Sequence, residues 1–535
     1  MKTNILSLLA IAGLLTFAGC ASDDTANKDN DQEPGTEGLT SFVEEDQATR
    51  TTGEYDGSGL NFYWTQDDRL WINTGTALAP VLTQDSKNNI NSKLEPHPTM
   101  PTTAVKRVAK ARFWFSGTYT ASSYPVRYTG KNGAADKVTI KAAQSQTIPN
   151  DASHIGEDGD CGVATATKPT GDTQYHFTLE HKAAYATFLP YNSPGVIKGA
   201  KITKIKVSAN ETIAGTYNFN DNGLDLTSPT NTSNSIEFTL NDFSLPKAST
   251  ATANAATMVI APGTYTNFTV EYTLNDPVTN VTGTITKTYP SVTFTAGKNK
   301  KVPTDLQIKV YPGDEYYMWD AADGQHYWKG HEWNKTGYTA GVDQPTVDTT
   351  SGSAYPQNNT DPRWGNESFP GYGVSNPATH SCKDLPNANE LSWYVVYGDP
   401  RWDADKFWAT MGHLYKGGMW FRKKSVLIAD GHYSTEKSAD GSTDLRTTFK
   451  YYSNNNASIT SGLPSAADAG KYFYLPALGS YVIGRPFLSS SEGKYWSSSG
   501  FPEYISQAYS LLFDSGSVTV SYNNCNVGFR VQAFE

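Results

Sequence analysis

The residues of this chain that could do chemistry are few, and several of them stand in one stretch, HYWKGHEW (residues 326–333). Its histidines, His326 and His331, and the carboxylate of Glu332 are ligand types that zinc prefers. A zinc-binding helix of the HExxH type places its two histidines four residues apart on one face, and the spacing here does not match. We therefore expect these side chains to be exposed or at the edge of a core, and not to bind a metal.

No other pattern in the sequence points to catalysis. There is no glycine-rich phosphate loop, no nucleophile elbow and no pair of carboxylates at a catalytic spacing. Cys382 and Cys525 are the cysteines of the C-terminal part, and neither has the sequence context of a catalytic thiol. The sequence thus predicts a protein that is not an enzyme and has no cofactor and no metal, while a contribution of calcium to binding stays open.

Length and charge narrow the class of protein further. A chain of 535 residues with 38% hydrophobic residues is long enough for roughly two to four domains. The formal net charge of −10 argues against nucleic acid as a partner, because phosphate binding needs a basic surface. The densest basic run, Arg422–Lys424, is short and typical of a solvated strand end.

The first residues, MKTNILSLLAIAGLLTFAGC, read as a secretory signal whose apolar run, residues 5–17, is too short to cross a bilayer as a helix. Ala-Gly before Cys20 resembles the lipobox of bacterial lipoproteins, which implies residues 1–20 as a signal peptide and acylation of Cys20. The following Ala-Ser-Asp-Asp resembles the export signal of surface lipoproteins of the outer membrane, which implies a lipid-anchored protein on the cell surface. The alternatives are an ordinary signal peptide and a merely solvated acidic segment. Residues 21–40 are expected to be a flexible acidic linker.

Cysteine usage predicts no disulfide framework. With Cys20 acylated, Cys161, Cys382 and Cys525 remain, so at least one thiol is unpaired. Cys382 with Cys525 is the one pairing that we consider, and it stays open.

From residue 41 to residue 310 the chain shows short alternations of apolar and polar residues, such as Phe268–Tyr272, broken by Gly, Pro and Asn. This period of two predicts β-sandwiches, one over 41–192 and a second over 198–310. Seven landmarks in this part resemble the fimbrillin family of type V pilin-like surface lipoproteins. They are TRT (49–51), GLNFYWTQDDRLWI (59–72), AQSQT (143–147), YHFTLEHKAAYATF (175–188), IAGTYNF (213–219), VIAPGTY (259–265) and FTAGKNKKV (294–302).

The fimbrillin resemblance implies a fold and a processing site. The fold is a pair of transthyretin-like β-sandwiches. In pilins of this family a protease cuts after an arginine near the start, which releases the anchor and the first strand so that subunits can exchange strands. Arg50 matches that position, and the alternative is that it is an ordinary arginine of a protein that stays anchored.

A third unit is predicted over residues 314–535, after Pro312-Gly313, where the tryptophan density rises. Its best helix is expected in residues 382–398: Asn387 and Glu390 can form a capping box, and Leu391, Tyr394 and Val395 share one face. We expect a second helix over 404–414. Strands are expected over 418–421, 425–428, 472–475 and 527–533, and a hairpin over 508–513 and 517–522.

Three landmarks of this unit resemble the FISUMP-type domain, which implies an α+β fold of the C-type-lectin-like kind. They are LPNANE, YFYLPALGSY and the closing YWSSS…AYSLLFDSGSV…GFRVQAF. Aromatic and small polar side chains in the last loops are suited to binding, because they give large contact area and adaptable hydrogen bonds. The predicted ligand-binding residues are Tyr504, Ser506, Tyr509, Asp514, Ser521, Tyr522, Asn523, Asn524 and Asn526.

Together these features predict a non-catalytic surface lipoprotein, an adhesin or pilus-tip protein whose head binds a glycan or protein of a host or bacterial surface. The alternative is a structural pilus subunit that assembles with other fimbrillin subunits by strand exchange after cleavage at Arg50.

Overall fold

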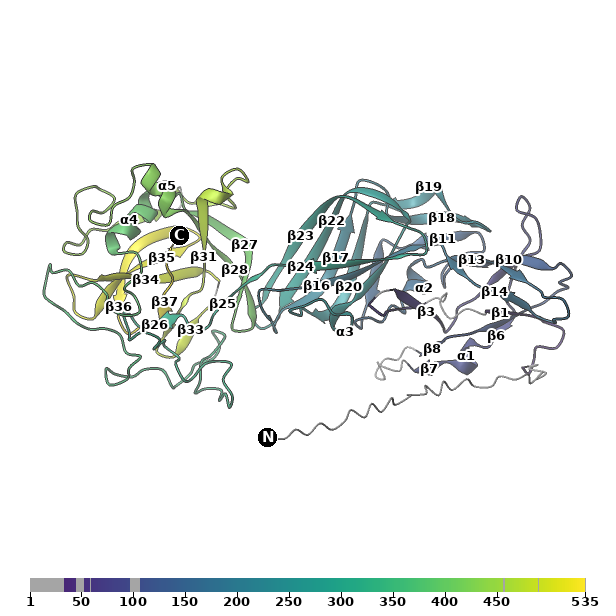
Figure 1. The fold of residues 1–535 in the computed structure, drawn as a ribbon, viewed down its shortest axis with the longest axis horizontal. Helices are drawn as coiled ribbons and strands as arrows, with labels where there is room; N and C mark the ends of the chain where they lie inside the picture. The colour runs from purple at the N-terminus through teal and green to yellow at the C-terminus, as the bar shows by residue number, and fades with distance from the viewer. Residues whose placement is uncertain are drawn as a thin grey trace, which may run out of the picture.

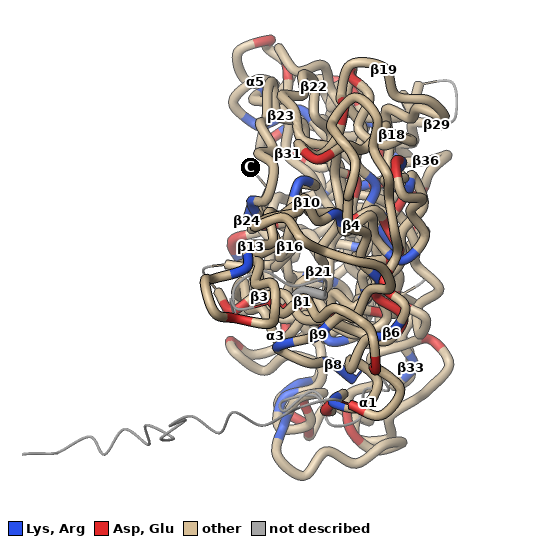
Figure 2. Tube along the Cα trace, turned by 90° about the vertical axis from the view of Figure 1, so that its right-hand side faces the viewer, with Lys and Arg blue, Asp and Glu red and all other residues tan. Residues whose placement is uncertain are grey.

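The computed structural model describes residues 33–44, 52–57, 59–96, 106–455, 458–488 and 490–534. The molecule is elongated and mainly β, with two sandwiches toward one end and a separate head at the other (Figure 1, and Figure 2 from the sandwich end). Residues 1–32, which include Cys20, lie outside the described residues, and so does Arg50. Of the expected linker, residues 33–39 form turns in which Thr36 is buried, and strand β1 begins at Thr40.

The first sandwich is built from one long sheet and one small sheet around an aromatic core that contains Phe42, Trp64 and Phe113. The long sheet has the order β5 (Leu82–Gln84), β4 (Trp71–Asn73), β10 (Ser123–Tyr128), β13 (Gly162–Thr167), β14 (Tyr175–Phe177), β1 (Thr40–Glu44), β9 (Arg112–Phe115) and β6 (Lys87–Asn88), with β15 (Glu180–His181) paired to β13. The small sheet has the order β2 (Thr52–Tyr55), β3 (Leu60–Thr65), β8 (Lys106–Val108) and β7 (Glu95–Pro96), beside helix α1 (Ile90–Lys93).

The second sandwich packs a broad sheet on two narrower ones around the largest core, which includes Ile205, Phe238 and Tyr272. The broad sheet has the order β12 (Ala143–Gln146), β20 (Ser235–Ser244), β17 (Lys201–Ser208), β22 (Gly263–Asp276) and β23 (Val281–Phe294). The other two have the orders β21 (Ala256–Ile260), β16 (Ala184–Tyr191), β24 (Asn299–Asp305) and β11 (Lys137–Ile140), β18 (Ala214–Asn220), β19 (Gly223–Ser233). Short helices α2 (Ile155–Asp158) and α3 (Ala251–Asn254) lie beside them.

The sheets do not divide at the expected join between residues 192 and 198. β11, β12 and β16 precede that point in the sequence, yet they pair with β18, β20 and β21 of the second sandwich. Alternation along a strand reports which face is buried but not which strand lies beside it. Pairing between distant segments therefore depends on the whole fold. It places β11, β12 and β16 in the second sandwich, so the boundary between the sandwiches is not the expected one.

The head contains two sheets, a short hairpin and helices α4 (Ala388–Tyr397) and α5 (Lys424–Ala429), with a 3-10 turn at Ala469–Lys471. One sheet has the order β25 (Lys309–Tyr311), β27 (Arg401–Thr410), β28 (His413–Arg422) and β31 (Tyr472–Pro476), with β30 (Thr460–Ser461) paired to β27. The other has the order β26 (Tyr316–Tyr317), β37 (Phe529–Arg530), β34 (Glu492–Gly500), β35 (Gln507–Asp514), β36 (Ser517–Asn524) and β29 (Tyr452–Asn455). The hairpin pairs β32 (Ser480–Val482) with β33 (Arg485–Phe487).

Two predicted elements of the head are wrong. Residues 404–414, expected as a helix, belong to strands β27 and β28. Phe407 packs into the core of the second sandwich and Trp408 into a core of the head, so neighbouring residues are buried on opposite faces, which only a strand covered on both sides permits. Residues 425–428, expected as a strand, form helix α5, in which Leu427 is buried and Ile428 is exposed. The last strand, β37, is also shorter than expected.

Candidate ligand-binding surface

Tyr504, Ile505 and Tyr522 form the exposed part of an aromatic surface on the head. Their side chains are exposed by 58%, 65% and 39%. Tyr504 and Ile505 lie in the loop between β34 and β35, whereas Tyr522 lies near the end of β36, opposite Tyr509 of β35. Figure 1 places β36 on the side of the head that faces away from the second sandwich. The surface is therefore accessible to a partner from outside the molecule.

The ring of Phe501 holds this surface together from beneath. Tyr522 stacks on it with 4.1 Å between ring centroids, and Tyr504 lies parallel to it within 4° at 5.9 Å. Phe449 meets Phe501 and Tyr522 edge to face at 5.4 Å and 5.6 Å. Aromatic pairs of this kind contribute about 0.5–1.5 kcal/mol each beyond the area they bury. The exposed tyrosines thus have few conformations to lose when a partner binds.

A segment that sequence reasoning missed completes the surface. Tyr372 is 79% exposed and packs against Phe369. Its loop is tied to the loop of Tyr504, because the amide of Gly373 donates to the carbonyl of Pro502 at 3.0 Å. The amide of Gly500 likewise donates to the carbonyl of Asn376 at 2.7 Å. In the sequence this segment is irregular and far from residue 504, and only an isolated Tyr between glycines could have indicated an exposed aromatic.

Asp320 fixes the base of the Tyr372 loop. Its buried carboxylate accepts hydrogen bonds from the Asn366 amide at 3.0 Å and from the backbone amides of Thr379 and His380 at 2.9 Å and 2.7 Å. The preceding residue, Trp319, donates its amide to the carbonyl of Cys525, just after β36. Trp319 and Asp320 therefore connect both ends of the loop that carries Tyr372 to the strand that carries Tyr522.

The structure does not gather all the predicted binding residues. Tyr509 is wrong as a surface residue: it is fully buried, and its hydroxyl donates to the carbonyl of Leu445 at 2.9 Å. Its neighbours in β35, Ala508 and Ser510, are fully buried as well, so this part of the strand is covered on both faces. Asp514 occupies the turn of the β35–β36 hairpin, about 23 Å along β35 from Gln507, and accepts a hydrogen bond from Gly516.

The remaining predicted residues divide between two faces. Asn524 lies on the same face of β36 as Tyr522 and is exposed, and Asn526 is exposed in the turn that follows. Ser521 and Asn523 point to the other face, where the amide of Asn523 donates to the hydroxyl of Ser510 at 2.9 Å. Ser506 is half-buried, and its carbonyl accepts from the amide of Cys525.

The cations near the aromatic surface are already paired. Arg446 contacts Asp444 at 2.8 Å and Glu436 at 2.6 Å, and Lys450 contacts Asp440 at 2.7 Å. The aromatic surface therefore attracts a partner through apolar and hydrogen-bonding contacts more than through charge.

His326, His331 and Glu332, the residues considered for metal binding, do not form one site. His326 Nε2 lies 3.3 Å from Glu332, whereas His331 Nδ1 lies 2.7 Å from Asp343. Burial lowers the pKa of His326 more than the neighbouring carboxylates raise it. In the described part of the chain no group of three or more His, Cys, Asp or Glu residues has an arrangement that could hold a metal ion.

The three described cysteines, Cys161, Cys382 and Cys525, are buried free thiols. Cys382 and Cys525 belong to the same cluster, with Trp319 and Trp496. Burial raises the pKa of Cys382 to about 12, and it also raises the pKa of Cys525 well above its ordinary value. Such thiols are poor nucleophiles, because the reactive form is the thiolate.

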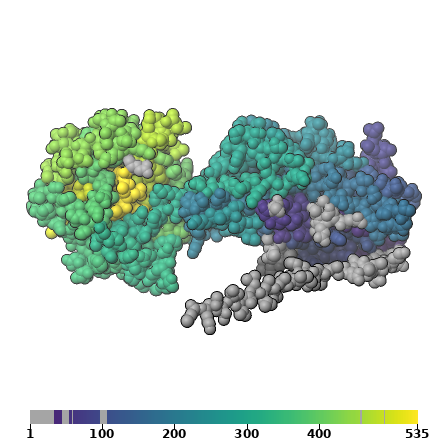
Figure 3. Space-filling model, viewed as in Figure 1, coloured from purple at the N-terminus to yellow at the C-terminus, as the bar shows by residue number. Residues whose placement is uncertain are grey.

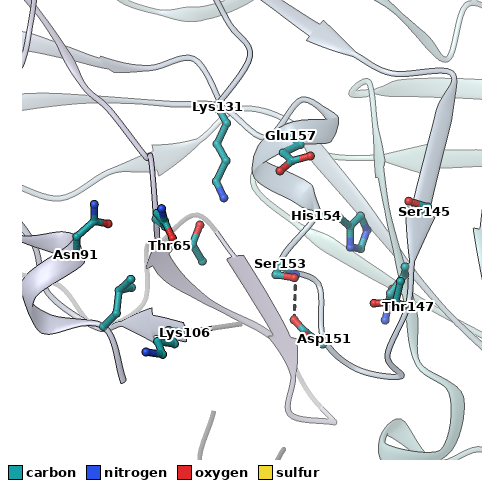
Figure 4. Close-up of a pocket in the computed structure, with 13 residues that line it drawn as sticks. Thr65, Asn91, Lys106, Lys131, Ser145, Thr147, Asp151, Ser153, His154 and Glu157 are labelled. Atoms are coloured by element: carbon teal, nitrogen blue, oxygen red, sulfur yellow. Dashed lines mark hydrogen bonds between the residues drawn. The ribbon is translucent and has the colours of Figure 1, made fainter. Parts of the chain in front are cut away.

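A polar cavity of about 700 Å³ lies on the sandwiches, lined among others by Lys131, Ser153, His154 and Glu157 (Figure 4). His154 Nε2 bonds to the carbonyl of Thr257 at 2.8 Å, and burial lowers the pKa of His154 to about 4. Ser153 donates its amide to Asp151, and no hydrogen bond joins its hydroxyl to His154 in the residues described. Ser153 and His154 are therefore not paired as a nucleophile and its base.

No model of a known protein family matches this sequence, and no curated protein matches it. Among the described residues no helix is long and apolar enough to cross a membrane.

Several solved structures resemble part or most of the chain. A candidate cell adhesion protein from Bacteroides ovatus is 11% identical over 50% of this chain and 93% of its own, with a TM-score of 0.30. A fimbrial assembly protein from Parabacteroides distasonis is 11% identical over 50% and 91%, with a TM-score of 0.26. A fimbrial protein from Bacteroides ovatus is 10% identical over 92% and 99%, with a TM-score of 0.24. Scores of this size do not establish a common fold, so the proposed function rests on the residues of this chain.

Proposed function

We propose that this protein is a lipid-anchored, non-catalytic adhesin of the outer membrane, whose head binds a surface glycan or protein through the aromatic surface. The observation that carries the proposal is the stack of Tyr504 and Tyr522 on Phe501, exposed on the side of the head away from the sandwiches. Exposed aromatic groups fixed by packing are typical of binding hot spots, because Tyr gives a large contact area at a small entropic cost. The lipobox-like sequence around Cys20 supports the anchor.

The binding proposal is tested with the chain from residue 21 onward, applied to glycan and surface-protein arrays. We expect binding that falls at least tenfold when Tyr504 and Tyr522 are both changed to Ser. The matched control is Tyr338→Ser, because Tyr338 is 42% exposed on a different loop and outside the aromatic surface. Absence of binding by the folded wild-type chain, or equal binding by the double variant, would overturn the proposal.

A second candidate function is a structural pilus subunit that exchanges strands, and the position of β1 favours it. β1 lies inside its sheet, antiparallel to β9 and parallel to β14, and Phe42 is fully buried. Arg50 follows β1 in the sequence, so cleavage there would remove the covalent link between β1 and the rest of the sandwich. Loss of β1 would leave the facing edges of β9 and β14 without a partner, and a strand from another subunit could pair there.

The N-terminus of the protein on intact cells distinguishes the two functions. An acylated Cys20, found by mass spectrometry, supports the anchored adhesin. A mature chain that begins at Thr51, recovered from high-molecular-weight fibres, would support strand exchange and exclude a standing anchor.

A further inference from the structure

The hairpin loop between β4 and β5, residues 74–81, exposes an unusual run of apolar residues. Ala77, Leu78, Ala79, Pro80 and Val81 are all exposed, Leu78 by 100%. The loop sequence, TGTALAPV, carries no charge. In the described part of the chain no other run of five apolar residues is exposed throughout. Exposure of an apolar run of this length to water is unfavourable, unless the surface of another molecule covers the run.

The apolar loop is held in one conformation by its own hydrogen bonds. Oδ1 of the buried Asn73 accepts from the amides of Gly75 and Val81 at 2.9 Å and 3.0 Å, and its Nδ2 donates to Asp221 at 2.8 Å. The amide of Thr74 also donates to the carbonyl of Val81 at 2.9 Å. A fixed loop loses little conformational entropy on docking, which is the usual property of a preorganised binding element.

The chain also contains a concave site of matching character. A notch of about 340 Å³ lies where the second sandwich meets the head. Apolar side chains of Pro194, Val196, Val310, Pro312, Trp333 and Met411 form much of its wall, and the carboxylates of Asp314 and Glu332 also line it. Four other cavities of the molecule are lined by three or more charged side chains each, such as Lys131 with Glu157, or Arg401 with Asp399. Of these five cavities the notch has the fewest charged side chains, so it suits an uncharged apolar loop better than the others do.

We propose that the apolar loop of one molecule docks in the notch of a second copy, so that molecules associate head to tail without exchanging strands. The contact must be between molecules, because β10, the neighbour of β4, lies at the end of the molecule remote from the head (Figure 1). Figure 3 shows a projection in the colour of these residues at that end. Because the two contacting surfaces differ, a chain of molecules keeps a free apolar loop at one end and a free notch at the other. The association is therefore open, and the assembly grows as the protein concentration rises.

The proposal is tested by pairing engineered thiols, since the native cysteines Cys161, Cys382 and Cys525 are buried. A Leu78→Cys preparation is mixed with a Val196→Cys preparation and oxidised with diamide, which takes two electrons and two protons as the two thiols join. We expect the cross-linked heterodimer to form at least tenfold faster than in a mixture of Leu78→Cys with Leu463→Cys. Leu463 is the control because it is 64% exposed on the head, away from the notch.

Light scattering of the unmodified chain gives the second readout. We expect the mean mass to rise with concentration, to stay at the monomer value for Leu78→Asp, and to rise normally for Leu78→Met. Equal cross-linking rates in the two mixtures, or a monomeric wild-type chain at every concentration tested, would overturn the proposal. Neither result depends on ligand binding by the aromatic surface, so this test can fail while the adhesin proposal stands.

Discussion

The carboxylate of Asp276 and the imidazole of His413 meet across the boundary between the second sandwich and the head, with 3.2 Å between Oδ2 and Nδ1. The same oxygen accepts from the amide of Leu414 at 2.9 Å, and Asp276 is fully buried. Beside this contact, Phe407 of the head lies so close to Gly283 that a Cβ there would stand 2.6 Å from the ring. The two units therefore share one packed interface.

Replacing Asp276 by Ala should destabilise this interface by about 2 kcal/mol, because the buried amide of Leu414 and the imidazole of His413 lose their acceptor. Urea unfolding followed by tryptophan fluorescence measures the change. Asp405→Ala is the control: its side chain is 93% exposed on the adjacent strand β27, and the change should stay within about 0.5 kcal/mol. Equal effects of the two substitutions would contradict the assigned role of Asp276.

Asp320→Ala should loosen the loop that carries Tyr372, because several buried or half-buried donors lose one acceptor. We expect amide hydrogen exchange of residues 366–382 to accelerate by at least a hundredfold, while β22 and β23 keep their protection. Asp323→Ala, a nearby exposed carboxylate that pairs with Lys383, should leave both regions unchanged. Uniform acceleration over the whole head would indicate global destabilisation instead.

The buried thiols should not react in the folded protein at pH 8. Burial holds the pKa of Cys382 at about 12, and no described cysteine is exposed to reagent. Titration of the chain from residue 21 with a chromogenic disulfide should therefore give no thiol in native buffer and three in denaturant. One thiol in denaturant would show that two cysteines had formed a disulfide, and Cys382 with Cys525 would be the first pair to examine.

Asp158 should make the protein less stable as the pH rises from about 4 to 6. Burial raises the pKa of Asp158 to about 6, although Lys141 at 3.3 Å opposes the shift. The folded state then binds a proton that the unfolded state releases near pH 4, so its stability falls across this window. Asp158→Asn should remove that fall, which we expect to be about 1–2 kcal/mol, in urea unfolding measured at pH 4 and pH 7. An unchanged pH dependence in the variant would contradict the assignment.

Local signals in the sequence predicted local structure well. The capping box of α4 is present, with the Asn387 side chain accepting from the Glu390 amide at 3.0 Å and Glu390 reaching back at 2.8 Å. The β35–β36 hairpin is confirmed around its turn at Asp514–Gly516. Both depend on contacts between residues close in the sequence, where spacing alone determines the geometry.

The binding surface was predictable only in part, because its members come from distant segments. Tyr504 and Tyr522 were found from composition, whereas the place of Tyr372 beside them depends on a hydrogen bond between Gly373 and Pro502. Tyr509 looked equivalent to Tyr504 in the sequence but faces the core. A pattern of Tyr and Ser does not say which face of a strand is covered, since that depends on helix α4, which packs on the sheet that contains β35 and β36.

β24 ends at Asp305 in the second sandwich and β25 begins at Lys309 in the head sheet, so three residues connect them. Asn192 binds both the amide and the carbonyl of Ile308, at 2.7 Å and 3.1 Å, and fixes this short connection. The head therefore cannot move far relative to the sandwiches to reach a ligand. Once a ligand is held, a pull on the head is transmitted directly to the sandwiches through this connection.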